Sequence, residues 1–164
     1  MKLKAIILLL LIFICNHIEA QTRYVYSSNK EFSLELPGDV YYDKKVDDGD
    51  SDIILYEELY NDDYEADLTV YKGSDYEYLE DLSKELNAMS DDLGYTEVRK
   101  FFKSSQNNEV NSEFYIGYSD ESESNVIFGI IQNSFSRRLY EFELFCLNID
   151  LTTANKIIRS IVIK

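Results

Sequence analysis

The chain has 164 residues, of which 31 are acidic and 16 are basic, so its formal net charge is −15. A surface of this charge repels phosphate backbones and anionic membranes, which argues against nucleic acid as a partner. His17 is the single histidine and lies in the first 20 residues with Cys15, so the rest of the chain lacks the residues of serine–histidine or cysteine–histidine catalysis and of the usual zinc sites.

The first 20 residues have the order of a secretory signal peptide. Lys2 and Lys4 precede an unbroken apolar run of eleven residues, 5–15, and a polar stretch then ends at Ala20. The run is shorter than the about 20 residues that a membrane-spanning helix needs, so we expect cleavage between Ala20 and Gln21 and no permanent anchor. A short segment led by lysines is typical of bacteria, which predicts a periplasmic or secreted protein.

Residues 21–164 have the length of a single domain, and the first half of this region predicts strands. Residues 32–36 alternate strictly between apolar and polar side chains and stop at Pro37 and Gly38, which is typical of a half-buried strand followed by a turn. Three further strands are predicted at residues 40–45, 53–60 and 66–71. The polar residues 47–52 and 61–63 between them predict loops.

A helix is predicted next. Ser74 is a suitable N-cap with Glu77 three residues later, as in a capping box, and Gly94 is a suitable C′ residue. Apolar residues recur between them at spacings of three and four, which predicts one buried stripe. The stripe consists of Leu79, Leu82, Leu86, Met89 and Leu93.

The remaining residues predict mostly strand and one more helix. Strands are expected at residues 96–103, 113–118, 126–131 and 140–146. In the strand at 126–131 both the odd-numbered and the even-numbered residues are apolar, so both of its faces should be covered. A helix with Leu151, Ala154, Ile157, Ile158 and Ile161 on its apolar side should begin after Asp150 and run into a short strand. These elements predict an α+β fold, an antiparallel sheet with helices on both faces in an α/β/α sandwich.

Cys146 is the only cysteine beyond the leader. It shares its parity with Tyr140, Phe142 and Leu144, so we expect it to point into the core as a small hydrophobic residue. The alternative, a reactive nucleophile, lacks a neighbour that would lower the pKa of its thiol.

Three stretches resemble the PsbP-like family. Residues 32–37 are similar to the opening strand and proline of the family, residues 78–82 to the start of its helix, and residues 154–161 to its closing helix. The resemblance spans most of residues 32–164 and implies the PsbP fold. It also implies a protein that works by binding or assembly rather than by catalysis.

One acidic loop partly matches a calcium-binding loop. Asp48, Asp50 and Asp52 occupy the first, third and fifth ligand positions, but Ile53 and Leu59 stand where the glycine and the bidentate glutamate belong. We therefore predict no dedicated metal site, and keep weak binding of divalent cations as an alternative function. A hydrolase that uses paired carboxylates is a further alternative, but with so many acids a suitable pair carries little information.

Tyrosine is abundant, with 14 in the chain, and several tyrosines stand among acidic residues. Such a surface suits recognition of a basic partner, although tyrosine is also comfortable at half-buried strand positions. The residues concerned are Tyr56, Tyr60, Tyr64, Tyr71, Tyr76 and Tyr78. The sequence therefore predicts an exported, non-enzymatic binding or assembly module of the bacterial envelope, whose partner is a basic envelope or secreted protein. We identify no catalytic residue and no cofactor.

Overall fold

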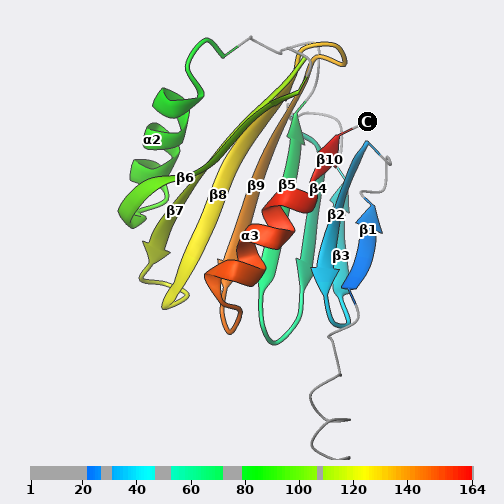
Figure 1. Ribbon diagram of the computed structural model, residues 1–164, viewed down its shortest axis with the longest axis vertical. Coiled ribbons are helices and arrows are strands. Elements are labelled where there is room, and N and C mark those ends of the chain that lie inside the picture. The colour runs from blue at the N-terminus through cyan, green and yellow to red at the C-terminus, as the bar shows by residue number, and fades with distance from the viewer. Residues whose placement is uncertain (1–21, 27–30, 47–52, 72–78, 107–108, 164) are drawn as a thin grey trace, which may run out of the picture.

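The computed structural model describes residues 22–26, 31–46, 53–71, 79–106 and 109–163 (Figure 1). Several predicted features lie outside the described residues: the cleavage point between Ala20 and Gln21, the loop 47–52 with its three aspartates, the cap residues Ser74 and Glu77, and Tyr76 and Tyr78.

The described residues form strands and helices in the order that the sequence predicts, with one short strand, Thr22–Tyr26, added before the first predicted one. The strands are β1 (Thr22–Tyr26), β2 (Phe32–Pro37), β3 (Tyr41–Val46), β4 (Ile53–Tyr60), β5 (Glu65–Tyr71), β6 (Thr96–Gln106), β7 (Val110–Ser119), β8 (Ser124–Asn133), β9 (Arg138–Cys146) and β10 (Val162–Ile163). The helices are α2 (Leu82–Asp92) and α3 (Leu151–Ser160).

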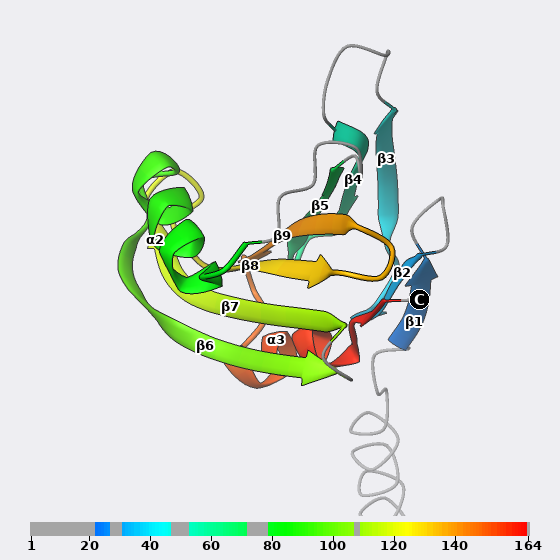
Figure 2. The ribbon, with the colours of Figure 1, turned by 90° about the horizontal axis from the view of Figure 1, so that it is seen from above.

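The strands belong to two antiparallel sheets. The large sheet has seven strands in the order β3-β4-β5-β9-β8-β7-β6, and the small sheet has three in the order β1-β2-β10. Short turns connect β7 to β8 and β8 to β9, whereas β5 and β9 are adjacent in the sheet but far apart in sequence. Figure 2 shows α2 at the curved end of the large sheet formed by β6, β7 and β8, and α3 nearer the small sheet.

The predicted fold class, an α/β/α sandwich with helices on both faces of one sheet, is wrong. The protein is mostly antiparallel sheet, and its helices are too few and too short to form two covering layers. Part of the cover on the large sheet comes from a second sheet, because β2 contributes Phe32, Leu34 and Leu36 to the same core as α3. The sequence analysis placed all strands in one sheet because alternation identifies a strand but not its partners.

The main core lies between the large sheet, β2 and α3. The ring centroids of Phe32 and Phe142 are 6.0 Å apart across the two sheets, and Cys146 lies in this core with 7% exposure, as predicted. A smaller core lies under α2, where Leu82 and Leu86 pack with residues of β7 and β8. Burying each such side chain contributes about 1.5–3 kcal/mol, so both cores hold the sheet in place.

Strand β8 runs between these two cores. Its buried side chains alternate between the main core and the core under α2, which confirms the prediction that this strand is covered on both faces. Gly129 is required here by space, because a Cβ atom at this position would lie 2.1 Å from the ring of Phe114. The strand therefore tolerates only glycine at the point where the Phe114 ring crosses it.

The beginning of the first helix differs from the prediction. Asp81, rather than Ser74, is the N-cap of α2, and its carboxylate accepts hydrogen bonds from the amides of Ser83 and Lys84. The amide of Leu79 donates to Oε1 of Gln132 at 3.1 Å, so this part of the backbone is bonded to β8 instead of continuing the helix.

The other predicted helix ends are confirmed. Gly94 follows the C-cap of α2 with φ of 70°, a conformation that favours glycine. Asp150 caps α3, where its carboxylate accepts a hydrogen bond from the amide of Thr153 at 2.7 Å. Neither helix in the described part of the chain has the length and apolar character that crossing a membrane requires.

Candidate binding groove

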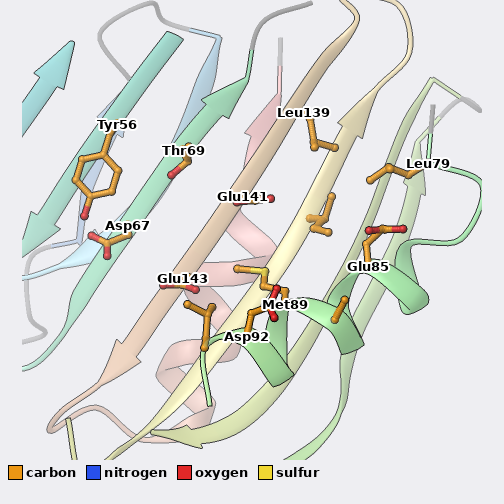
Figure 3. Close-up of a pocket in the computed structure, with 13 residues that line it drawn as sticks. Tyr56, Asp67, Thr69, Leu79, Glu85, Met89, Asp92, Leu139, Glu141 and Glu143 are labelled. Carbon is orange, nitrogen blue, oxygen red and sulfur yellow. The ribbon is translucent and has the colours of Figure 1, made fainter. Parts of the chain in front are cut away.

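A groove lies beside α2 on the open face of the large sheet. Because α2 packs over β7 and β8, it leaves the neighbouring strands β9 and β5 uncovered, and a cavity of ≈ 480 Å³ remains between them and the helix (Figure 3). The lining residues come from β4, β5, β8, β9, α2 and the segment before it: Tyr56, Asp67, Thr69, Leu79, Glu85, Ala88, Met89, Asp92, Leu93, Ile130, Leu139, Glu141 and Glu143.

The floor of the groove follows from the pleat of the strands. Side chains two residues apart lie on one face, so Glu141 and Glu143 of β9 point away from the core side of Phe142. In the register of the sheet, Asp67 of β5 stands opposite Glu143 and Thr69 stands opposite Glu141. Figure 3 shows Asp67, Glu141 and Glu143 on the sheet surface that faces α2.

The wall of the groove combines apolar and acidic side chains of α2 and of its C-cap residue, Leu93. Met89 is half-buried, Leu93 is exposed, and Glu85 and Asp92 add two carboxylates. The groove thus carries five carboxylates, and no lysine or arginine is among the described residues that line it.

A row of acidic residues crosses the sheet into this groove. Asp43 is opposite Glu58, Glu58 is opposite Asp67, and Asp67 is opposite Glu143, on the neighbouring strands β3, β4, β5 and β9. Neighbouring strands lie about 4.8 Å apart, and like charges directly opposite one another destabilise a sheet. This row of acidic residues therefore lowers the stability of the sheet, and the need to fold does not explain it.

Burial and mutual repulsion alter the acidity of the floor. Burial, helped by the charges of Asp67 and Glu141, raises the pKa of Glu143 to about 7, although a hydrogen bond from Tyr95 opposes the shift. Burial also raises the pKa of Glu141, whose Oε2 accepts a hydrogen bond from the hydroxyl of Tyr71 at 2.6 Å. The carboxylates of the floor are therefore costly to ionise. A nearby cation would stabilise their ionised form.

An ionic cluster around the buried carboxylate of Glu113 fixes α2 next to the groove. Glu113 of β7 is 1% exposed, and its carboxylate accepts a hydrogen bond from the Ser83 hydroxyl of α2 at 2.7 Å. The ammonium groups of Lys100 and Lys103 lie 3.0 and 2.9 Å from its two oxygens. The helix and two strands therefore meet at one carboxylate, which holds the groove wall in position.

The tyrosines that the sequence analysis grouped together separate in the structure. Tyr56 and Tyr71 are half-buried on the groove side of the sheet, and Tyr60 is exposed and stacks on Tyr41 with ring centroids 5.9 Å apart. Tyr64 is fully buried in the main core, where its hydroxyl donates to the carbonyl of Pro37 at 3.0 Å. Tyr64 therefore serves the core, as the alternative interpretation predicts, whereas Tyr60 stands at the surface and Tyr56 and Tyr71 are partly accessible on the groove side.

The sequence analysis missed the acids that form the floor. Glu141 and Glu143 lie within the strand recognised for Cys146, and the same alternation that places Cys146 inward places them on the other face. That signal was available. No signal in the sequence indicated that they lie close to Asp67, because β5 and β9 pair across about 75 residues of sequence.

Two further features bear on the chemistry of this face. A second hollow of ≈ 290 Å³ shares Asp67 with the groove and is lined also by Glu65 and Glu121. Among the described residues, no group of three or more histidine, cysteine or acidic side chains is arranged to hold a metal ion. The carboxylates of the groove and of the second hollow are therefore spread along the surface of the sheet and do not converge on one binding point.

Comparison with known proteins identifies the fold. No protein-family model matches the chain, and no curated protein does. The solution structure of cyanobacterial PsbP (CyanoP) from Synechocystis sp. PCC 6803 is similar, with a TM-score of 0.55 over 88% of this chain and 94% of that chain. The chain has a PsbP-like fold. The identity is 12%, so the likeness concerns the fold, and it confirms the predicted resemblance at that level.

Proposed function

We propose that this protein is an exported, non-enzymatic accessory or assembly protein that binds a basic segment of a partner protein in the groove beside α2. The observation that carries the proposal is the composition of the groove, with five carboxylates and an apolar wall. The PsbP-like fold supports an accessory role, and the apolar run that follows Lys2 and Lys4 supports export.

The chemistry of the groove defines the partner. Half-buried carboxylates at Glu141 and Glu143 gain most from a cation that donates hydrogen bonds to them directly, such as a lysine or arginine side chain. Met89 and Leu93 offer apolar area beside them, which favours aliphatic side chains next to the basic ones. The occupant is therefore a segment in which basic and aliphatic residues alternate or share one face.

The overall charge assists the encounter. A net charge of −15 attracts a basic partner from a distance and speeds association, an effect that salt screens within about 10 Å at 0.1 M. The contacts in the groove then set the rate of dissociation.

The test uses a fluorescent heptapeptide in which lysine and leucine alternate, acetylated at its N-terminus and amidated at its C-terminus. We expect the mature protein to bind it, and the double variant Asp67→Asn/Glu141→Gln to bind it about tenfold more weakly, since losing charged contacts costs about 1.5 kcal/mol. Fluorescence anisotropy at low and high salt measures both effects. Glu109→Gln, which removes an exposed acid outside the groove, is the matched control.

Two results would contradict the proposal. One is equal binding of a peptide with glutamate in place of lysine. The other is an unchanged affinity in the double variant when circular dichroism shows that it is folded.

A further inference from the structure

We propose that the groove binds its basic partner with the release of a proton from Glu143, so that the affinity rises with pH across neutrality. This inference rests on the proposed function and adds a form of regulation to it.

The geometry places Glu143 where ionisation is sensitive to a neighbouring cation. Its side chain is half-buried in the middle of the floor, with Asp67 opposite it on β5 and Phe128 opposite it on β8. The hydroxyl of Tyr95, which follows α2, favours the ionised form of Glu143 and so acts to lower its pKa, and the ring centroid of Tyr95 lies 5.2 Å from that of Phe128. Glu143 therefore has an acid on one side and aromatic rings on the other.

Every neighbouring element of the groove presents acidic or neutral groups toward this position. The described titratable groups are Asp67 and Tyr71 from β5, Glu141 from β9, Tyr56 from β4, Glu85 and Asp92 from α2, Tyr95 after α2, and Glu121 from the turn between β7 and β8, which acts on Tyr95. The charges of Asp67 and Glu141 oppose the ionisation of Glu143, and the hydrogen bond from Tyr95 favours it.

The sign of the pH effect follows from these neighbours. Burial and the charge of Asp67 raise the pKa of Glu143 to about 7, so the free protein carries a neutral Glu143 in about half of the molecules at this pH. A lysine or arginine side chain in the groove stabilises the carboxylate and lowers the pKa of Glu143, and the displaced proton passes to the buffer. Binding is then linked to proton release, and raising the pH favours the complex.

The size of the effect is set by the protonated fraction. Between pH 6 and pH 8 the ionised fraction of a group with a pKa of about 7 rises about tenfold, so we expect about tenfold tighter binding at pH 8. The lysines of the peptide stay charged throughout this range, because their pKa is about 10.4. The pH dependence then reports on the groove and not on the peptide.

The experiment is calorimetric titration with the lysine–leucine heptapeptide at pH 7 in phosphate and in Tris, two buffers with different enthalpies of ionisation. We expect release of about half a proton per peptide bound. In Glu143→Gln the release should fall by at least half and the affinity should change little between pH 6 and pH 8. Glu109→Gln should behave as the unmodified protein does. Carbon-detected NMR of the free protein, with Glu143→Gln to assign the signal, measures the titration of Glu143 directly.

The outcomes separate the two proposals. Binding of the peptide without proton release, or with equal release in Glu143→Gln, overturns this inference and leaves the proposed function intact. A Glu143 carboxyl that titrates below pH 5 in the free protein also overturns it. No binding at any pH overturns the proposed function and this inference together.

Discussion

Two glutamates on the same face of the large sheet have opposite electrostatic surroundings. Burial alone would raise the pKa of Glu113, but hydrogen bonds from Lys103, Ser83 and Lys100 overcome it and lower the pKa to about 2. Glu143 is surrounded by other acids, and its pKa is raised to about 7. The first carboxylate is therefore a structural link between α2 and the sheet, and the second is available to a ligand.

At the scale of the residue, Glu113→Gln should destabilise the protein by about 1–2 kcal/mol at pH 7. A buried pair costs more to break, but the heads of Lys100 and Lys103 are exposed and water screens them. The pKa of Glu113 is lower in the folded protein than in the unfolded chain. The difference in unfolding free energy between the unmodified protein and Glu113→Gln should therefore be full above about pH 5 and disappear as the pH falls toward 2. Urea unfolding at pH 7, 4 and 2.5 measures it, with Glu109→Gln as the control. An equal loss at pH 7 and pH 2.5 would contradict this origin of the stability.

At the scale of the element, α2 owes its position to its first turn. Asp81 satisfies two amides at the start of the helix, and Ser83 reaches Glu113 in the same turn. Just before α2, the amide of Leu79 donates a hydrogen bond to Gln132 of β8, and Leu79 itself lines the groove. The wall of the groove is thus fixed at the end of α2 where the helix begins.

Replacing this cap tests where the helix starts. Asp81→Ala should cost about 1 kcal/mol, the usual value for losing an N-cap, and Asp81→Asn should cost much less because asparagine caps equally well. Thermal unfolding followed by circular dichroism compares the two variants. Equal stability of Asp81→Ala and the unmodified protein would mean that the helix begins elsewhere.

At the scale of the whole molecule, the excess of acidic side chains produces self-repulsion. The net charge is −15, and the groove and the second hollow bring several of these charges onto one surface. Such repulsion destabilises the compact state and is relieved by screening.

Salt should therefore stabilise the protein. Raising NaCl from 0.02 to 0.5 M is expected to raise Tm by roughly 2–5 °C, about 1 kcal/mol for a protein of this size. At pH 8, where Glu143 is mostly ionised, the triple variant Asp67→Asn/Glu141→Gln/Glu143→Gln should have a higher Tm at low salt and a smaller response to salt, because it removes three repelling carboxylates from one face. Scanning calorimetry at the two salt concentrations measures both quantities. An unchanged salt response in the triple variant would place the repulsion outside the groove.

The sequence by itself determined the positions of most strands, the C-terminal helix and the inward direction of Cys146, because these depend on the local period of apolar residues. It also predicted basic partners and a resemblance to the PsbP-like family, and the similarity to a solved structure confirms the fold. The predicted start of the helix was wrong, since Leu79, which the predicted stripe includes, precedes α2 and its amide donates a hydrogen bond to Gln132 of a distant strand.

Only the tertiary structure decided how the strands divide between two sheets and which acids meet. The pairing of β5 with β9 brings Asp67 next to Glu143, and β1 and β10 assemble on β2 from the two ends of the described chain. Each strand carries its own alternation, but nothing in that alternation names the partner strand or the register. The groove exists because α2 covers two strands and stops short of the next two, and this depends on packing between segments that are distant in sequence.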